Sequence, residues 1–347
     1  MPQHSTLIHA ASDGYQAARR HAALIDRTDR GRIVVSGADR GTYLQGLLTN
    51  DIQALRAGQG CYSAYLTPQG RMIADMYVYE LGDAMLLTTI REVKDAVLFK
   101  LDQFVFAEDV QLGDVTASFA QFAIVGPQAA QVVASALGRM SASALAEMPE
   151  HGNARVDWRG SAAIVTRTSD AGEAGYDVYV ETAQAEALKA AIANAGVPLL
   201  DSAVADAIRI EAGVPVFRRD MDEETIPLEA GIESRAISFT KGCYVGQEVI
   251  VRVVHRGHGR VARKLVGLRV DGDRVPAAGA AIQAGADDTA RDAGRVTSST
   301  WSPALGQPIA IGYVHRDFVE PGTELTIEGA AAKVVALPFV PAPAALG

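Results

Sequence analysis

Cysteine is nearly absent from this chain, which has only two among its 347 residues. Cys61 and Cys243 are far apart, and neither belongs to a Cys-x-x-Cys pair or to a Cys/His cluster with the spacing of metal ligands. This scarcity argues against a zinc or iron–sulfur site built from this chain alone. It also favours a reducing compartment, where disulfides are rare.

Long apolar runs are lacking as well. No stretch approaches the ~20 apolar residues that a membrane-spanning helix needs. The N-terminus has no basic region followed by an apolar run, so it does not resemble a signal peptide. We therefore expect a cytoplasmic protein without membrane contact, and the length predicts two or three globular domains.

Positive charge is in the minority, with 32 basic against 41 acidic residues and a formal net charge of −9. Contact with a polyanion would therefore need a local patch. One basic run stands out: Arg252, His255, Arg256, His258, Arg260, Arg263 and Lys264. The β-branched residues 249–254 and the glycines nearby predict a strand and a turn here. The run is either a solvated face between domains or an anion site for carboxylates, phosphates or an RNA backbone.

Hydrophobic periodicity predicts mixed α+β structure over the first 240 residues. The expected strands are 32–36, 72–79, 84–89, 122–126, 162–166 and 176–180. The expected helices are 39–48, 93–104, 127–138, 182–196 and one capped by Asp201. We expect 139–160 to be irregular. After residue 260, short strands at 264–270, 280–283, 309–314, 323–327 and 333–336 predict a small β-barrel or sandwich, followed by a loose tail at 337–347.

Residues 241–248, Lys-Gly-Cys-Tyr-Val-Gly-Gln-Glu, are a candidate for chemistry. Cys243 lies between two glycines, which allow unusual backbone conformations, and the ammonium group of Lys241 could stabilise its thiolate. The alternative is that Cys243 is a small buried filler.

Two strand acids form a second candidate site. Asp75 and Asp177 both occur within predicted strands, where aspartate is depleted. They either point outward to solvent or point into a pocket. In a pocket, a carboxylate can accept two parallel N–H bonds, as a pterin ring offers.

Several motifs occur together in one order: Gly37-Ala38-Asp39, Leu48 to Asp51, Gly70 to Asp75, Gly172 to Asp177, and Ile210 to Pro215. In this arrangement the chain resembles the folate-dependent aminomethyltransferases, the glycine cleavage T-proteins. At 241–248, T-proteins generally carry a Phe-Ile-Gly-Lys/Arg-Glu type of sequence. The signature found here resembles that of the YgfZ branch, which acts in iron–sulfur protein maturation; it comprises Lys241, Gly242, Cys243, Tyr244, Gly246, Gln247 and Glu248.

The resemblance implies two α+β parts within 1–245, one of them inserted at about 56–117, and a C-terminal antiparallel β-barrel over 260–347. These would surround a central folate-binding opening. Asp75 would lie near the transferred one-carbon unit, and Tyr79, four residues later, would also belong to the folate pocket. Asp177 would bind the pterin, and Arg209 would pair with a folate carboxylate. Asp170 departs from the pattern, because T-proteins usually have a tyrosine there.

The first functional hypothesis is a protein that binds tetrahydrofolate, or a one-carbon-substituted folate, and supports assembly or repair of iron–sulfur enzymes, including tRNA-modifying ones. Its partners would be those enzymes or their assembly factors, and Cys243, Lys241 and Asp75 would carry any chemistry. The alternative is an aminomethyltransferase that moves a one-carbon unit from a lipoyl carrier to tetrahydrofolate. A third hypothesis is a scaffold that contacts RNA through residues 252–264. The role of Cys61 stays open.

Overall fold

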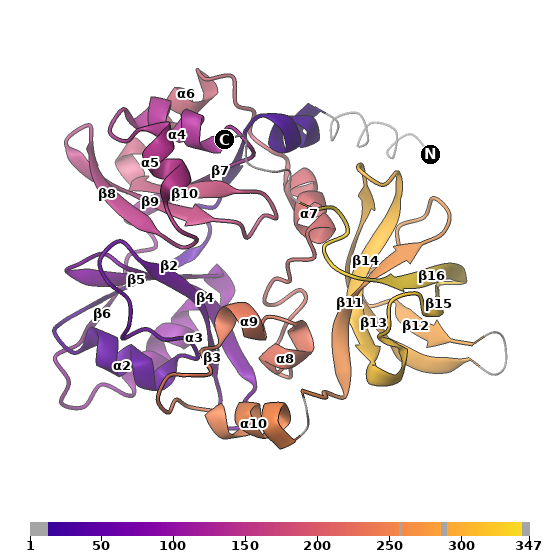
Figure 1. Ribbon diagram of the computed structural model, residues 1–347. Helices are drawn as coiled ribbons and strands as arrows, with labels where there is room; N and C mark the ends of the chain where they lie inside the picture. Colours follow the sequence, from indigo (N-terminus) through magenta and orange to yellow (C-terminus); the bar gives the residue numbers. More distant parts are fainter. Residues whose placement is uncertain (1–12, 257–258, 286–289, 342–347) are drawn as a thin grey trace.

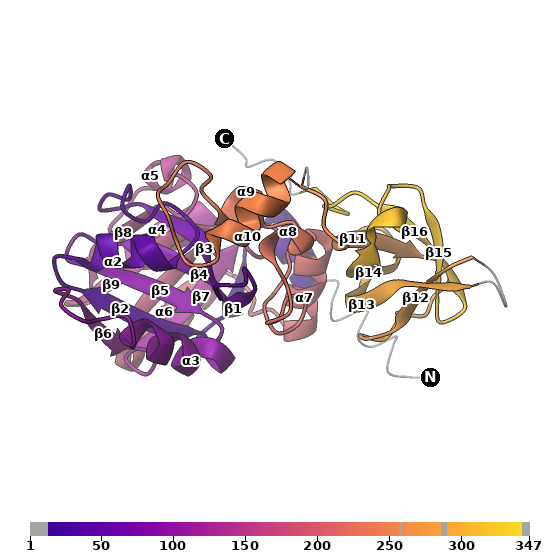
Figure 2. The same cartoon turned by 90° about the horizontal axis from the view of Figure 1, so that it is seen from below.

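The computed structural model describes residues 13–256, 259–285 and 290–341 and divides them into two α+β parts and a barrel (Figure 1). Figure 2 shows the two sheets on one side and the barrel on the other, with the segment from α7 (Ser202–Glu211) to α9 (Glu233–Ala236) between them. Within these ranges, no helix is long and apolar enough to cross a membrane.

The first sheet has the strand order β1-β7-β10-β9-β8, and all its neighbours are antiparallel. Its core is made by the sheet and three helices, which bury alternate apolar residues. Gly138 ends the first of these helices in the left-handed conformation, with φ 63°. The elements are β1 (Ala23–Asp26), β7 (Phe119–Val125), β8 (Asn153–Trp158), β9 (Ser161–Thr168), β10 (Gly175–Glu181), α4 (Ala129–Leu137), α5 (Ala142–Glu147) and α6 (Ala185–Ala193).

The second sheet, ordered β3-β4-β5-β2-β6, is formed by the chain between β1 and β7. It begins at Gly31, earlier than the expected insertion point near residue 56, because β2 pairs with both β5 and β6. Helices from the later segment 227–251 complete its core. The elements are β2 (Gly31–Ser36), β3 (Gly60–Leu66), β4 (Met72–Glu80), β5 (Ala84–Thr89), β6 (Gln111–Asp114), α2 (Arg40–Leu47), α3 (Arg91–Asp102), α8 (Pro227–Ala230) and α10 (Gln247–Val251).

The third part is a closed six-stranded antiparallel barrel with the order β11-β14-β13-β12-β15-β16. The barrel confirms the predicted α+β fold with a C-terminal barrel. Its longest strand, β13, was not predicted, because its sequence RDAGRVTSSTWS has few apolar residues. The strands are β11 (Arg263–Val270), β12 (Ala281–Ala284), β13 (Arg291–Ser302), β14 (Gln307–His315), β15 (Glu324–Ile327) and β16 (Ala330–Val335).

Three local predictions were wrong. The β-branched run 249–254 is helical, in α10 and a following π-helical turn, because one face buries Ile250 against the second sheet. Residues 139–160 contain α5, capped by the Ser141 hydroxyl at 3.1 Å from the Ala144 N–H, and also β8. The tail is not loose over residues 337–341, where Phe339 is buried against Ile210 and Ile309; residues 342–347 lie outside the described residues.

A buried carboxylate at the end of α7 joins the barrel to the first part. Glu211 accepts a hydrogen bond from the Tyr15 hydroxyl at 2.6 Å and forms an ion pair with Arg19. Its other oxygen accepts the Ser302 hydroxyl and the Ala304 N–H, both in the barrel. The N-terminal helix through residues 13–20, α7 and the barrel therefore meet at one side chain.

Arg19 also pairs with a second buried acid, Glu173, and this acid predicts a pH effect on stability. Burial raises the pKa of Glu173 to about 7, although Arg19 opposes the shift. In the folded protein Glu173 keeps its proton up to about pH 7, whereas in the unfolded chain it releases that proton near its ordinary pKa of 4.5. The free energy of unfolding therefore falls as the pH rises from 4.5 to 7. We expect Glu173→Gln to flatten this part of the melting temperature profile, measured between pH 4.5 and 8. Glu186→Gln, at an exposed site, should leave the wild-type slope; an unchanged slope in Glu173→Gln would contradict the assignment.

Candidate functional site

A narrow pocket of about 50 Å³, which we call the deep pocket, lies where the second sheet faces the loop after α7. Its floor comes from β4 and β5, and its walls come from β3, the loop after β9, the loop after α7 and α9. We define the deep pocket by six of its lining residues: Arg30, Tyr62, Asp75, Tyr77, Asp170 and Arg235. The predicted site residue Asp75 is among them, whereas Arg30, Tyr62, Tyr77 and Arg235 carry no local sequence signal that would select them.

Asp75 points toward this pocket because side chains alternate along β4 and its own face is half-buried. Its Oδ2 accepts a hydrogen bond from the Tyr62 hydroxyl at 2.7 Å. The Thr89 hydroxyl donates to the Asp75 carbonyl at 2.8 Å and fixes the strand. Burial raises the pKa of Asp75, while Tyr62 and nearby arginines oppose that shift. The result is an oriented carboxyl group that can hold a proton more readily than an exposed aspartate.

Aromatic rings form one side of the pocket. The ring of Tyr77 lies 5.1 Å from that of Tyr62 and 5.3 Å from that of His151, measured between centroids. The guanidinium carbon of Arg235 lies 5.2 Å from the Tyr62 ring centre, at cation–π distance. These flat surfaces suit a planar ligand.

Asp177, predicted to bind a pterin, already has its partners within the protein. It is only 2% exposed, and both oxygens lie 3.1 Å from Nη1 of Arg27. Nε2 of Gln121 donates to Oδ2 at 3.0 Å. Asp177 therefore lies behind the pocket wall and supports Arg27 rather than facing a ligand.

Asp170, and not Asp177, is the acid of this pair that lines the deep pocket. Nη2 of Arg27 lies 2.6 Å from its Oδ1, and Nη1 of Arg30 lies 3.1 Å from its Oδ2. Burial opposes ionisation, but these two arginines outweigh it and hold the pKa of Asp170 well below its ordinary value. The residue that departs from the T-protein pattern is thus an ionised member of a buried charge network.

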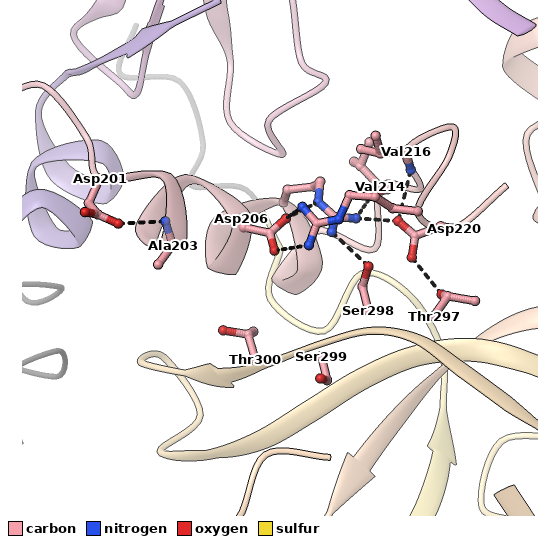
Figure 3. Close-up of polar contacts among 12 residues, drawn as sticks. Asp201, Ala203, Asp206, Val214, Val216, Asp220, Thr297, Ser298, Ser299 and Thr300 are labelled. Carbon is pink, nitrogen blue, oxygen red and sulfur yellow. Dashed lines mark hydrogen bonds and ion pairs between the residues drawn. The ribbon is translucent and has the colours of Figure 1, made fainter. Parts of the chain in front are cut away.

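Arg209 does not line the pocket, so its predicted pairing with a folate carboxylate needs correction. Figure 3 shows the polar cluster that joins α7 to the barrel. Nε of Arg209 donates to Asp206 at 2.7 Å, and Nη1 donates to Asp220 at 2.7 Å. Nη2 donates to the Ser298 hydroxyl of β13 at 3.0 Å. The three guanidinium nitrogens of Arg209 therefore bind α7, the following loop and the barrel, and they do not face the pocket.

Tyr79, predicted to bind folate, is not among the residues that line the deep pocket. It is 1% exposed and packs with Leu86, Ile164 and Tyr179 in a cluster between the two sheets. Since β4 alternates, Tyr79 lies on the same side as Asp75 and Tyr77 but four residues along the strand. It therefore supports the wall from the sheet interface.

Lys241 bonds to the backbone at the end of α2. Its ammonium donates to three carbonyls there, those of Gln45 at 2.7 Å, Leu48 at 2.6 Å and Asn50 at 2.7 Å. Cys243 is exposed on the loop. The hydrogen bonds of Lys241 among the described residues thus cap a helix and do not reach Cys243.

The other cysteine, Cys61, is half-buried, and burial raises its pKa to about 12. It is therefore a neutral thiol, not a reactive thiolate. Within the described ranges, no group of three or more His, Cys, Asp or Glu side chains could hold a metal ion.

A wider cleft adjoins the deep pocket on the barrel side. It has a volume of about 820 Å³, within the range of ligand sites at ~300–1,000 Å³. Val214, Pro215 and Arg235 line both spaces. Lys264 of β11 lines the outer part, so a ligand in the deep pocket would extend toward the barrel.

The basic run 252–264 does not form one uniform surface. Arg252 pairs with Glu248 at 2.6 Å, and Arg263 pairs with Glu229 at 3.2 Å. Arg260 and Lys264 line a groove that also contains acidic side chains. His255 is exposed, His258 lies outside the described residues, and the side chain of Arg256 is not described.

Comparison with known families gives the pocket a context. Residues 2–241 match the GCVT N-terminal domain, and residues 263–341 match the Glycine cleavage T-protein C-terminal barrel domain. This chain belongs to the glycine cleavage T-protein family. It is 32% identical to an aminomethyltransferase of Rubrobacter xylanophilus, covering 94% of the chain and 85% of that protein. It is 31% identical to one of Saccharopolyspora erythraea, covering 94% and 88%.

A solved T-protein has the same fold. The crystal structure of glycine cleavage system aminomethyltransferase T from Bartonella henselae superposes with a TM-score of 0.85 at 25% identity, covering 96% of this chain and 90% of that one. The shared architecture therefore extends over both α+β parts and the barrel.

These relatives overturn the first functional hypothesis. The assignment to iron–sulfur maturation and tRNA modification rested on residues 241–248, whereas the full-length relatives are named aminomethyltransferases. In the structure, Lys241 of this motif stabilises the end of α2, so its presence does not by itself indicate an iron–sulfur function. Membership of the T-protein family stands, and the iron–sulfur function was wrong.

The placement of Lys241 predicts a loss of stability when it is replaced. Lys241→Met keeps the apolar stem but leaves three carbonyls without their donor, which should lower the free energy of unfolding by about 1–3 kcal/mol in urea titration. Cys243→Ser, at an exposed position, should change it by less than ~0.5 kcal/mol. A stable Lys241→Met variant would mean that the carbonyls have other partners.

Proposed function

We propose that this protein is a folate-dependent aminomethyltransferase, which transfers a one-carbon unit from an aminomethylated lipoyl carrier to tetrahydrofolate. The observation that carries the proposal is Asp75, held by Tyr62 in a pocket lined by the second sheet, Asp170 of the first part and the loop after α7. The aminomethyltransferases to which the chain is similar support the reaction type. Enzymes of this kind in the glycine cleavage system use tetrahydrofolate.

The side chains that line the deep pocket have the chemistry that a reduced pterin needs, and the pocket's own volume of about 50 Å³ means that the ring would also occupy the adjoining wider cleft. Tyr77 and Tyr62 offer aromatic surface, and Asp75 offers carboxylate oxygens to N–H donors, whereas both oxygens of Asp170 are paired with arginines. Asp177 is left out of the ligand contacts, because Arg27 and Gln121 occupy its oxygens. When bound, the folate supplies the nitrogen that receives the one-carbon unit.

Asp75 has the central role in this proposal. Its raised pKa and its bond to Tyr62 let it orient the reacting nitrogen and hold a proton beside it. Arg235, at the junction of the two spaces, faces the same ligand from α9. The lipoyl carrier would reach this point through the wider cleft. Contact with RNA through residues 252–264 is not part of the proposal, since acids interrupt that run.

The test is an aminomethyl-transfer assay with purified aminomethylated lipoyl carrier protein and tetrahydrofolate. We expect activity in the wild type and a loss of roughly 10²–10⁴-fold in kcat for Asp75→Asn, which keeps the shape but cannot exchange a proton. Asp83→Asn, an exposed acid at the turn after β4, is the matched control and should stay at the wild-type rate. An inactive wild type with correctly folded protein would contradict the proposal, and full activity in Asp75→Asn would remove Asp75 from it.

A further inference from the structure

A buried threonine in the deep pocket has no hydrogen-bond partner. Thr88 is 1% exposed, and its Oγ1 finds neither donor nor acceptor among the described residues. A buried hydroxyl without a partner destabilises a protein and is uncommon in folded chains. Because Thr88 also lines the deep pocket, its missing partner belongs to whatever fills that space.

The sheet places Thr88 beside the proposed reacting groups. It lies on β5 directly opposite Tyr77 of β4, and residues opposite each other project to the same face. Asp75 lies two residues from Tyr77 on that strand and shares its face. Thr88, Tyr77 and Asp75 are therefore neighbours on the pocket floor. The hydroxyl of the neighbouring Thr89, by contrast, donates a hydrogen bond to the Asp75 carbonyl.

Another buried threonine supplies a comparison. Thr166 on β9 is fully buried, and its hydroxyl lies near the hydroxyls of Tyr79 and Tyr179. It does not line the deep pocket. The two threonines thus share burial and differ in access to the pocket.

We propose that Thr88 is a ligand-binding residue, whose hydroxyl hydrogen-bonds a polar atom on the edge of the folate heterocycle. The inference rests on the proposed function and deepens it. A ring stacked against Tyr77 would bring its edge to the β5 side of the pocket, where Thr88 lies beside Asp75. A hydroxyl both donates and accepts, so it matches a ring that alternates N–H groups with nitrogen and carbonyl acceptors.

The experiment measures tetrahydrofolate binding by fluorescence titration and the melting temperature of the ligand-free protein. Thr88→Val removes the hydroxyl at nearly constant shape. We expect its Kd to rise by roughly 5- to 100-fold, because the ligand group then stays buried without a partner. Its ligand-free melting temperature should stay equal or increase, since an unsatisfied buried hydroxyl is lost. Thr88→Ser should bind within roughly threefold of wild type.

Thr166→Val is the control for binding: it removes a buried threonine hydroxyl outside the pocket, and its Kd should be unchanged. An unchanged Kd in Thr88→Val, with binding intact in the wild type, would overturn the inference and leave the proposed function standing. A ligand-free melting temperature that falls in Thr88→Val would also overturn it, because the hydroxyl would then have a partner such as a bound water. Failure of the wild type to bind tetrahydrofolate would remove both proposals.

Discussion

The arrangement of the three parts depends on a pair of buried charges at the end of α7. Arg209 and Glu211 lie two residues apart, and each contacts the barrel through a serine of β13, Ser298 and Ser302. Arg209 forms an ion pair with Asp220, and Glu211 forms one with Arg19. Removing one partner of either pair leaves an uncompensated buried charge, which costs several kcal/mol. The loop that follows α7 forms a wall of the deep pocket, so the contacts that dock the barrel also set the position of that wall.

Much of the fold could be predicted from the sequence, because apolar periodicity and caps are local signals. The helix ended by Gly138 and the helix capped by Asp201 are examples. The run 249–254 could not be predicted correctly, since its β-branched composition favours a strand while burial of Ile250 against a distant sheet favours a helix. Tertiary packing outweighed local propensity there.

The site divides in the same way. Asp75 could be found as an acid within an apolar strand, but Tyr62, Thr88 and Arg235 carry no local signal, since each becomes a pocket residue only through strand pairing or the return of α9 to the second sheet. Conversely, Arg209 appeared functional through the family resemblance, and Lys241 because its ammonium lies two residues from Cys243 in the sequence. Their protein acceptors lie on other segments and are invisible in a linear reading.

The pairing of β1 with β7 has a consequence for synthesis on the ribosome. Asp26 pairs with Phe122 and Ala23 with Val125, so the whole second sheet lies between the two strands in the chain. A nascent chain must therefore hold β1 without a partner while roughly a hundred further residues emerge, and such non-local closure is slow. The inserted sheet gains its own core helices only with residues 227–251. Both sheets therefore complete their cores late in translation. Until β7 emerges, the unpaired edge of β1 is exposed, and a chaperone could bind there.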